Sequence, residues 1–593
     1  MFFLFIFNLN FNILYIIKMS SYWGVDNTVQ IGETKVEIPA ENGLSFSGGQ
    51  KVSFNVPEDQ VKFIDGKNSY FSWDVKIALP AGKAPTRLQL DEAGGNILVK
   101  NCRIYSSNKN TLIEEIIDWN CQTTIRYDYD VDASKRNLRA LQEGGTSYSV
   151  ANRGTLGNSK SYLSDTVTNP YFVKNNADQT TTDWSDDDFT TAKCCVPLVN
   201  SGIFSGSIYP NLMSGLYIEL DLERPERVIK QLDSATMHRR LRLNPVFFST
   251  DNDVSAPEDW GAGVEKTVIY LSADQNLYGA NRVERCPFVR GETIGLVKLS
   301  DKSIPNMSTD MTITSIEADA TSGLIKLGFD ATTNSEAFDI TSGDYAVYST
   351  AVDSQTSYAA TYTLSNVNLV INSIELDPAY ERGMIAKARE GQNIEFDIMS
   401  TTTYKNTLLA SDRQTAIQVH ANNRRAKALL IQALDSSIYT SAELISSNNT
   451  YEVSDSAMDI TLNSARSGMT SICDQLSSIQ YQIDSILTPS RPISTKKCAT
   501  GLSIDAFHLF ELEKGLDNSG ITPRSFARYL DNFVLSRGFA TNRGAMDLTN
   551  KDVTVLLKYE ETAQPTKPKM INTYVTHARK LIMSGDGSVE IQV

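Results

Sequence analysis

Residues 478–493 read SIQYQIDSILTPSRPI and show in one stretch how the chain is built. Ile479, Tyr481 and Ile483 alternate with polar residues, a pattern typical of a strand with one buried face. The segment Pro489-Ser490-Arg491-Pro492 then interrupts that pattern. Because proline fixes φ and donates no ladder hydrogen bond, we expect the strand to end and the chain to turn there. The stretch therefore predicts a half-buried strand followed by a proline-bracketed corner.

The composition favours sheets and large apolar cores. The 593 residues are 41% hydrophobic and include 25 Tyr and 23 Phe, and aromatic and β-branched residues favour strands. A chain of this length holds three or four domains, or two large ones with insertions. The net charge is −15 and no run of five basic residues occurs, so we expect no specific nucleic-acid site.

The cysteines indicate reduced thiols in an intracellular protein. Their number is odd and no CxxC spacing occurs, whereas a secreted disulfide framework has paired cysteines. Two of them are adjacent and cannot easily bridge each other. The seven are Cys102, Cys121, Cys194, Cys195, Cys286, Cys473 and Cys498.

Residues 1–18, MFFLFIFNLNFNILYIIK, are apolar but do not resemble a standard targeting segment. No basic residue precedes the apolar run, no small-residue cleavage site follows it, and its length is marginal for a membrane span. We interpret it as an extension ahead of a working start at Met19, outside the mature protein; a membrane anchor or signal segment is the alternative. Residues 19–43 are interpreted as a polar N-terminal arm with a short strand at Thr34–Pro39.

Alternation of apolar and polar residues predicts a first sandwich over residues 44–400. The segment Thr111–Trp119 differs, because its apolar residues fall at helical spacing and predict a short helix. Residues 142–193 are rich in Ser, Thr, Asn, Asp and Gly and predict a long surface excursion. The predicted strands are Lys51–Val56, Phe71–Leu79, Asn96–Tyr105, Leu216–Leu222 and one through Val367, Leu369 and Ile371 that ends near Asp377-Pro378.

Residues 225–362 interrupt this sandwich and predict an inserted domain. Short strands separated by Gly and Asp-Ser turns have the spacing of a small β-barrel. The predicted strands are Val268–Leu271, Ile294–Leu299, Met311–Ile316, Leu324–Phe329 and Tyr345–Tyr348.

Residues 401–593 repeat the plan and predict a second sandwich. Within Ser411–Asp435 we expect a hairpin around Asn422-Asn423, with a helix over Arg424–Leu434 as the alternative. A helix is expected over Ile504–Lys514, ended by Gly515 and with Ile504, Phe507 and Phe510 on its apolar side. The remaining expected elements are a strand at Val553–Tyr559 and a closing hairpin of Thr573–Met583 with Ser588–Val593.

No catalytic, cofactor-binding or metal-binding residues are expected. The histidines lie in unrelated contexts, and HExxH, GxSxG, phosphate-loop and zinc spacings do not occur. A glycosidase-type carboxylate pair is not marked by any pattern. The histidines are His238, His420, His508 and His577, and we interpret His508 as a structural residue of its helix.

Three other groups of residues have a structural and a functional interpretation. Asp183, Asp186, Asp187 and Asp188 lack the EF-hand pattern and are interpreted as a solvated acidic loop, with calcium binding as the alternative. Arg424, Arg425 and Lys427 are interpreted as a solvated strand end, with phosphate binding as the alternative. Phe71 and Trp73 lie on a strand's apolar face and are expected in the core.

Several segments, taken in order, resemble double-jelly-roll major capsid proteins of the virophage and polinton-like virus kind. The resemblance runs from about residue 44 to the end, and the order of the segments makes it more specific than any one of them. The segments are GGQKVSFNVP (48–57), YFSWDVKI (70–77), SGIFSG (201–206), YPNLMSGLYIELDL (209–222), RCPFVRGETI (285–294), SNVNLVINSIELDPAY (365–380), QYQIDSILTPSRPI (480–493) and DVTVLLKY (552–559).

This resemblance implies an all-β fold of two consecutive jelly rolls and a structural, non-enzymatic role. Three copies would form a pseudo-hexagonal capsomer that tiles an icosahedral shell around a DNA genome, assembled in the host cell. The insertions would project outward and the arm would face the interior. The implied partners are other copies of the chain, a penton protein, and a minor capsid or cement protein, with no lipid anchor in the mature protein.

Two other function classes remain as alternatives. A surface β-sandwich protein that binds carbohydrate or acts as an adhesin would be expected to carry disulfides or an export signal. A β-sandwich hydrolase would be expected to carry a recognisable catalytic pair. Neither feature is marked in the sequence.

Overall fold

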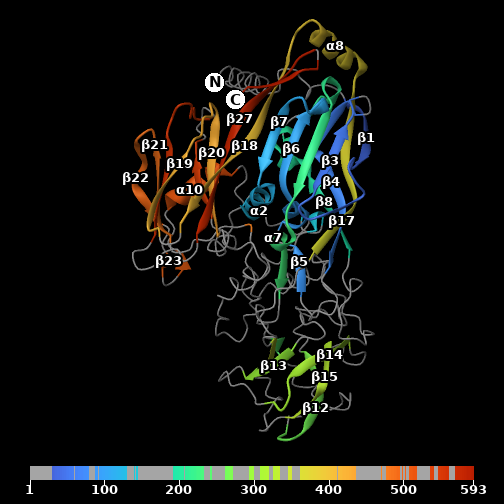
Figure 1. Ribbon diagram of the computed structural model, residues 1–593, viewed down its shortest axis with the longest axis vertical. Helices are drawn as coiled ribbons and strands as arrows, with labels where there is room; N and C mark the ends of the chain where they lie inside the picture. Colours follow the sequence, from blue (N-terminus) through green and yellow to red (C-terminus); the bar gives the residue numbers. More distant parts are fainter. Residues whose placement is uncertain are drawn as a thin grey trace, which may run out of the picture.

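The computed structural model is built mainly from antiparallel strands (Figure 1). It describes residues 30–58, 61–78, 87–90, 93–129, 142–144, 191–205, 208–232, 241–242, 261–271, 293–298, 307–318, 325–333, 345–349, 361–409, 412–435, 476–494, 497–498, 501–502, 506–516, 534–539, 545–559, 568–585 and 587–592, together with Arg139 and Met469. The acidic loop at 183–188, His238, Cys286, Cys473 and residues 1–29 lie outside these ranges, so the interpretations made for them stay predictions.

Two four-stranded sheets, β1-β17-β4-β8 and β3-β9-β6-β7, form the first sandwich. The short strand β2 (Ser45–Ser47) adds to β17. The strands are β1 (Gln30–Pro39), β3 (Lys51–Val56), β4 (Phe63–Ala78), β6 (Val99–Ser106), β7 (Leu112–Ile117), β8 (Thr191–Pro197), β9 (Leu216–Leu222) and β17 (Thr361–Leu376).

Two further sheets, β18-β27-β20-β25 and β19-β26-β21-β22, form the second sandwich, and β28 (Val589–Gln592) adds to β27. Its strands are β18 (Ile394–Leu408), β19 (Gln414–Val419), β20 (Ala426–Asp435), β21 (Leu476–Ile483), β22 (Ile486–Ser494), β25 (Leu535–Gly538), β26 (Val553–Tyr559) and β27 (Lys569–Met583). Because β18 begins at Ile394, the expected division at residue 400 falls inside a strand of the second sandwich.

Both sandwiches have the same strand order. Counting the eight main strands along each block, one sheet contains the first, eighth, third and sixth, and the other contains the second, seventh, fourth and fifth. Within each sheet, neighbouring strands pair antiparallel. This is the strand order of a jelly roll, in which two Greek keys close into a double sheet. We call residues 30–376 without the inserted sheet roll 1, and residues 394–592 roll 2.

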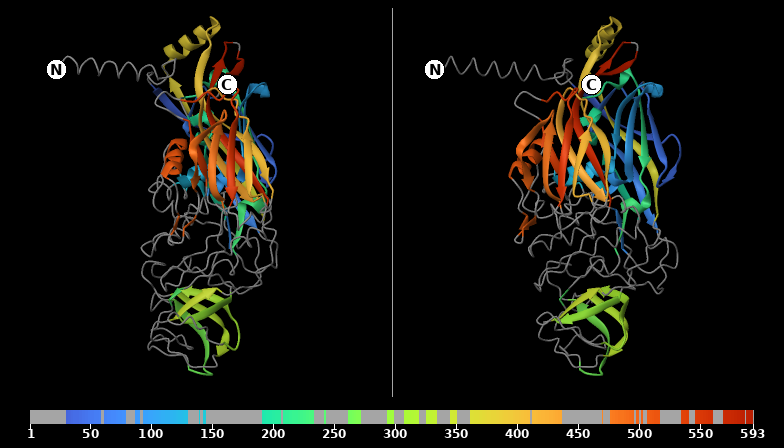
Figure 2. Two further views of the ribbon diagram at one scale, coloured as in Figure 1. Left: turned by 90° about the vertical axis from the view of Figure 1, so that its left-hand side faces the viewer. Right: turned by 60° about the vertical axis from the view of Figure 1, so that its left-hand side comes forward.

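The five longest connections start and finish at one end of the rolls. Strand direction alternates along each block, so the connections at 79–98, 118–190, 223–360, 436–475 and 495–534 share one end, which we call the insertion end. Helix α8 (Pro378–Arg389), which joins the rolls, lies at the opposite α8 end (Figure 1). The strands of both rolls run side by side between these two ends (Figure 2).

The other elements are short and lie in the connections. The helices are α2 (Trp119–Tyr129), α6 (Gly202–Ser205), α7 (Pro225–Val228) and α10 (Ala506–Gly515), with 3-10 turns η2 (Gly94–Leu98), η3 (Ser107–Lys109), η6 (Leu198–Asn200) and η7 (Asn211–Met213). Two-stranded pairs are formed by β5 (Arg87–Leu90) with β10 (Ile229–Leu232), and by β23 (Lys497–Cys498) with β24 (Gly501–Leu502). No helix among the described residues has the length and apolar character needed to cross a membrane.

One apolar core extends from roll 1 into roll 2. Its roll 1 members include Phe54, Phe71 and Trp73, whose side chains are fully buried and whose rings stack in series. A second core lies between the two sheets of roll 2. Because a protein interior is close-packed, a shared core fixes the two rolls relative to each other. The roll 2 residues of the shared core are Ile394, Phe396, Ile398, Leu430, Leu434, Met469, Leu512, Leu516, Val534, Tyr574, Leu581, Met583 and Val589.

Strands with one buried face were predicted well. Strand β3 has the predicted bounds, and β9 alternates strictly between buried and half-buried residues. The core position predicted for Phe71 and Trp73 is confirmed, as is the closing hairpin of β27 and β28. Helix α8 was not predicted, although Pro378 at its first position is a common helix start.

The predicted helix at Thr111–Trp119 is wrong, because Leu112–Ile117 form strand β7 and the helix starts only at Trp119. Strand β7 pairs with β6 through an irregular register, and it is covered on its other side by roll 2. Ile113 and Glu114 are therefore both buried, which removes the period-two pattern from the sequence.

The proline-bracketed corner is also wrong, whereas the strand before it is confirmed. The chain turns earlier, at Asp484 and Ser485, whose φ angles are 52° and 69°. Strand β22 then runs through the prolines, and Gln480 opposite them donates to the carbonyl oxygens of Pro489 and Ser490 at 2.9 and 3.2 Å. The prolines are tolerated because residues 489–492 form a bulge opposite Gln480, and because β22 is the edge strand of the sheet that the structure describes.

The two strands expected on either side of Asn422-Asn423 are present, but they do not pair with each other as a hairpin. Strand β19 pairs with β26, and β20 pairs with β27 and β25, so the segment crosses from one sheet to the other. The alternation of each strand is satisfied against the same core, so sequence alone did not separate a hairpin from a crossing. The alternative helix over Arg424–Leu434 is wrong as well.

Helix α10 is present, but Phe510 does not lie on a buried side of it as predicted; Ile504 and the Phe507 side chain lie outside the described part of the structure. Phe510 is 62% exposed, whereas Glu511 and Leu512 are buried. The Glu511 carboxylate accepts hydrogen bonds from the Arg537 side chain at 2.6 Å and the Gly538 N–H at 2.8 Å. These contacts orient the helix against β25, and Gly515 lies at its end within its bounds.

The inserted segment contains all five predicted strands, in one six-stranded sheet of order β11-β16-β13-β14-β15-β12. The strands are β11 (Leu241–Arg242), β12 (Glu265–Leu271), β13 (Thr293–Lys298), β14 (Met311–Ala318), β15 (Ile325–Thr333) and β16 (Tyr345–Ser349). The sheet lies beyond the insertion end of the rolls (Figure 1). The described part of the expected N-terminal arm, Gln30–Pro39, forms an edge strand of roll 1.

Candidate functional site: the polar junction between the two rolls

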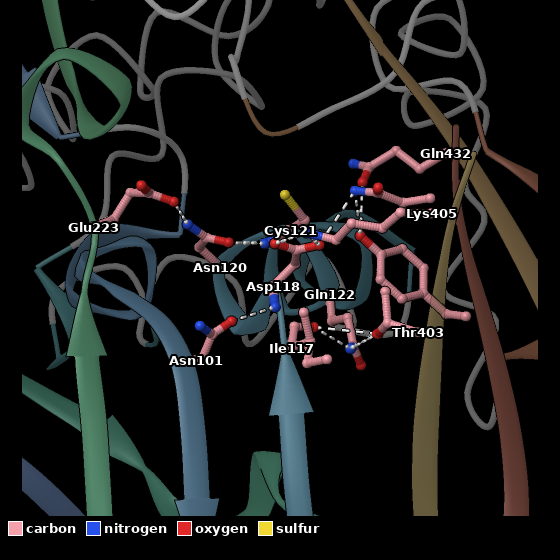
Figure 3. Close-up of polar contacts among 12 residues, drawn as sticks. Asn101, Ile117, Asp118, Asn120, Cys121, Gln122, Glu223, Thr403, Lys405 and Gln432 are labelled. Atoms are coloured by element: carbon pink, nitrogen blue, oxygen red, sulfur yellow. Dashed lines mark hydrogen bonds and ion pairs between the residues drawn. The ribbon is translucent and has the colours of Figure 1, made fainter. Parts of the chain in front are cut away.

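A buried polar cluster joins the rolls where β7 ends and α2 begins (Figure 3). Asp118 lies between these two elements with a φ of 55°, and its side chain is fully buried. Its backbone N–H donates to the Asn101 side chain at 3.2 Å, and its carbonyl accepts from the Gln122 N–H at 3.0 Å. The turn therefore holds a carboxylate at a fixed position facing roll 2.

Roll 2 supplies a cation and an amide to this carboxylate. Lys405 Nζ lies 2.8 Å from one Asp118 oxygen and 3.0 Å from the other, and the two side chains point toward each other (Figure 3). Asn572, the cross-strand neighbour of Lys405, approaches the same carboxylate at 3.4 Å. Burying a charge is costly unless it is paired, so this contact favours the one arrangement in which the rolls face each other.

The cluster continues along the face of β27 that lies against roll 1. Asn572 donates to the Tyr574 hydroxyl at 3.2 Å, and that hydroxyl donates to Gln432 at 3.0 Å. Gln432 in turn donates to the Met469 carbonyl. Burial raises the pKa of Tyr574 well above its usual value, so the hydroxyl stays protonated as a donor.

On the roll 1 side of the junction, Glu223 holds the start of helix α2 in place. Its carboxylate accepts from the Asn120 side chain at 3.0 Å and pairs with Arg227 at 3.1 Å, while its carbonyl accepts from the Tyr362 hydroxyl at 2.5 Å. Arg227 also approaches the Cys121 sulfur at 3.5 Å, and burial raises the pKa of that thiol to about 12. The thiol is therefore neutral and unreactive at neutral pH.

A second contact links the rolls through α6. The buried Glu114 carboxylate on β7 accepts from the Gly202 and Ile203 N–H groups at 2.9 and 3.0 Å. Burial raises the pKa of Glu114, and the two amide donors partly oppose that effect. Gly202 lies directly against the Met399 carbonyl of β18, so close that a Cβ would overlap it.

Among the histidines whose side chains the structure describes, His577 lies in the junction region. Its Nε2 is 2.8 Å from the Thr402 hydroxyl, and burial, with a smaller effect from Arg579, lowers its pKa to about 4. Between pH 6.5 and 4 the unfolded chain therefore binds a proton here that the folded chain does not.

We expect the free energy of unfolding to fall as the pH drops from 6.5 toward 4, and more steeply in the native chain than in His577→Asn. Urea titrations at several pH values measure both slopes. A His577→Asn slope equal to that of the native chain would contradict this assignment, because the remaining carboxylates titrate in both proteins.

Of the other candidates from the sequence, Arg425 is described and lies apart from this junction. Arg425 pairs with Asp397 at 2.9 Å on the surface, in agreement with a solvated strand end. Among the described residues, no group of three or more His, Cys, Asp or Glu side chains is placed to hold a metal ion. Of the four cysteines whose side chains the structure describes, three are buried and none is in a disulfide.

The junction residues were missed in the sequence because they match no chemical motif. Asp118 and Lys405 are 287 positions apart, and Asp118 and Asn572 are 454 apart. The sequence offered one signal of a buried polar contact, namely Lys405, which lies within a strand that ends in the apolar Leu408. The junction fixes the geometry between the two rolls, and its charged side chains pair with one another.

Solved capsid-protein structures resemble this chain over nearly its whole length, whereas no protein-family model and no curated protein matches it. VP54 of PBCV-1, fitted into a reconstruction of the virophage Sputnik, matches 95% of this chain and 97% of its own at 10% identity and a TM-score of 0.45. The Faustovirus major capsid protein matches 94% and 91% at 9% identity and 0.45. The mavirus major capsid protein matches 94% and 90% at 10% identity and 0.41.

Proposed function

We propose that the chain is a major capsid protein, the non-enzymatic structural subunit of an icosahedral virus with a DNA genome. The observation that carries the proposal is the presence of two jelly rolls of identical strand order, held side by side by a shared core. Three such chains supply six similar rolls, which approximate a hexagon and can tile a shell. Kinship with virophage and polinton-like virus capsids is part of the proposal, supported by the order of the sequence segments.

The two ends of the rolls support a proposed orientation in the shell. The inserted sheet lies beyond the insertion end, and we assign it to the outer surface as a small barrel-like tower. Strand β1 begins opposite Leu376, next to α8, so Gln30 lies at the α8 end. That end would face the interior, where the arm contacts neighbouring capsomers.

The polar junction has a defined role in this proposal. A capsomer keeps its shape only if the rolls of each subunit do not rotate against each other, and the Asp118–Lys405 and Gly202–Met399 contacts oppose such rotation. The proposed partners are other copies of the chain, a penton protein and a minor capsid or cement protein. The proposed location is the virion.

The mass of the protein in solution tests the proposal. Protein expressed from Met19 is expected to elute as a homotrimer by light scattering, and negative-stain images of that peak should show hexagonal outlines. A monomer that assembles at no salt concentration or pH would contradict the proposal. Binding to glycans by such a monomer would instead favour a surface binding protein.

A further inference from the structure

Four polar side chains share one face of the sheet where β18 pairs with β27, namely Ser400, Thr402, His577 and Arg579. In the register Ser400 is opposite His577, and the other two each lie two residues farther along their own strand. Because side chains alternate across a sheet, all four point to the same side. The cross-strand neighbour of Thr402 is Val575, which is buried in the core between the two sheets of roll 2. This polar row therefore faces the interior of roll 2.

Three side chains of the polar row have a buried atom with no hydrogen-bond partner among the described residues. Ser400 and His577 are 2% and 0% exposed, and the atoms concerned are the hydroxyl Oγ and the imidazole Nδ1. The third atom is Nε of Arg579, a residue that is half-buried as a whole. Most buried polar atoms in proteins have a partner, so three unpartnered atoms in one short row point to a bound group between them.

The hydrogen bonds within the polar row determine which of these atoms are donors. Arg579 Nη2 lies 3.4 Å from Thr402 Oγ1, and because a guanidinium can only donate, the hydroxyl oxygen accepts there. We assign the hydroxyl proton to the bond with His577 Nε2, which is 2.8 Å away. A pKa of about 4 keeps this imidazole neutral at pH 7, and a neutral imidazole that accepts at Nε2 carries its proton on Nδ1. The unpartnered atoms therefore offer an imidazole N–H, a guanidinium N–H and a hydroxyl.

The positive charge of this row has no carboxylate in contact with it within the described part of the chain. The hydrogen bond of Arg579 goes to the Thr402 hydroxyl, and burial lowers the pKa of the guanidinium. The carboxylate whose charge opposes that effect is Glu114, and its two oxygens already accept the N–H groups of Gly202 and Ile203. A charge and three donors without an acceptor favour an anion, because a water molecule would also need acceptors for its own hydrogens.

We propose that roll 2 binds a small monovalent anion of the size of chloride between Ser400, His577 and Arg579. The ion would accept hydrogen bonds from the three donors and neutralise the guanidinium. A monatomic ion suits the site because directly opposite Cβ atoms of two paired strands are only about 5 Å apart. Since the residue before Ser400 is Met399, whose carbonyl lies against α6 of roll 1, the ion would also stiffen the roll 2 side of the junction. The inference does not depend on the proposed capsid function.

Unfolding of the full native chain at different chloride concentrations tests this site. Sodium gluconate replaces sodium chloride at a fixed protein concentration, so the ionic strength stays constant while the small anion is exchanged for a bulky one. Above the dissociation constant, each tenfold rise in chloride is expected to raise the equilibrium constant for folding about tenfold, because one ion binds the folded state. An equilibrium constant that stays the same from chloride-free buffer upward would overturn the proposal.

Substitutions within the polar row separate this site from general salt effects. Ser400→Ala removes one donor with little change in volume, so the variant should fold and its dissociation constant for chloride should rise about tenfold. Arg579→Met removes the charge and should abolish the chloride dependence. Arg425→Met is the matched control, since Arg425 pairs with Asp397 on the surface and lies outside the row. A chloride response of Ser400→Ala equal to that of the control would show that the ion does not bind here.

Bromide locates the ion directly, because it replaces chloride and scatters X-rays anomalously. Crystals of the native chain grown in sodium bromide are expected to show an anomalous peak between Ser400 Oγ, His577 Nδ1 and Arg579 Nε. Electron density at that point without an anomalous signal would identify a water molecule and overturn the anion site. Neither result bears on the capsid function, which the mass of the protein in solution tests separately.

Discussion

Replacing Lys405 with methionine is expected to destabilise the protein by about 3 kcal/mol, because it leaves the Asp118 carboxylate without its cation. Removing one partner of a buried pair costs about 3–5 kcal/mol. The Lys405 side chain is 38% exposed and that of Asp118 is fully buried, which favours the lower part of that range. Urea unfolding of the purified protein, followed by far-UV circular dichroism, measures the change.

The matched control for this prediction is Lys580→Met. Lys580 pairs with Glu395 at the same distance of 2.8 Å, but both side chains are 40% exposed, so water replaces the lost partner. We expect little change in the unfolding midpoint. If Lys405→Met and Lys580→Met lowered the free energy of unfolding equally, the burial of Asp118 would not explain the importance of its ion pair. Adding Asp118→Leu to Lys405→Met should restore part of the lost stability, because no unpaired charge remains.

The sequence predicted strands wherever one face of a strand meets the core and the other meets water. Strand β9 alternates strictly between buried and half-buried residues, and β3 departs from alternation only at the buried Ser53. Strand β7 is covered on both sides, and the buried Glu114 interrupts its apolar residues. The remaining apolar residues then fall at helical spacing by chance. The turn at Asp484 and Ser485 was missed because the prolines that follow are a stronger signal of chain reversal, and an edge strand removes their cost.

The pairing of strands could not be predicted in the same way. Strand β1 pairs with β17 across the inserted sheet, and nothing in a strand's own residues identifies so distant a partner. The polar junction is an extreme case, because Asp118 looks like an ordinary helix-start residue until Lys405 is placed beside it. The resemblance to capsid proteins predicted the two rolls as units, but not the residues that hold them together.

Replacing Gly202 with alanine is expected to have a larger effect than the loss of the Lys405 charge. The added Cβ would overlap the Met399 carbonyl of roll 2, and a backbone atom inside a sheet cannot move aside as a flexible side chain can. To relieve the overlap, α6 would have to withdraw from β18 and remove the Gly202 and Ile203 N–H donors from Glu114. A buried carboxylate with neither donor is itself destabilising, so we expect a loss of more than about 4 kcal/mol.

Gly383→Ala is the control, because Gly383 lies in α8 with nothing within 4 Å of an added Cβ. There alanine should be neutral or stabilising by about 0.5–1 kcal/mol, since it favours the helix. Thermal unfolding and hydrogen exchange at β7 and β18 measure both variants. If the junction is a single cooperative unit, Gly202→Ala will raise exchange in β7 and β18 together, while the inner strands β9 and β26 remain protected. Native-like exchange in β18 would contradict this view, because it would mean that roll 2 keeps its position without the α6 contact.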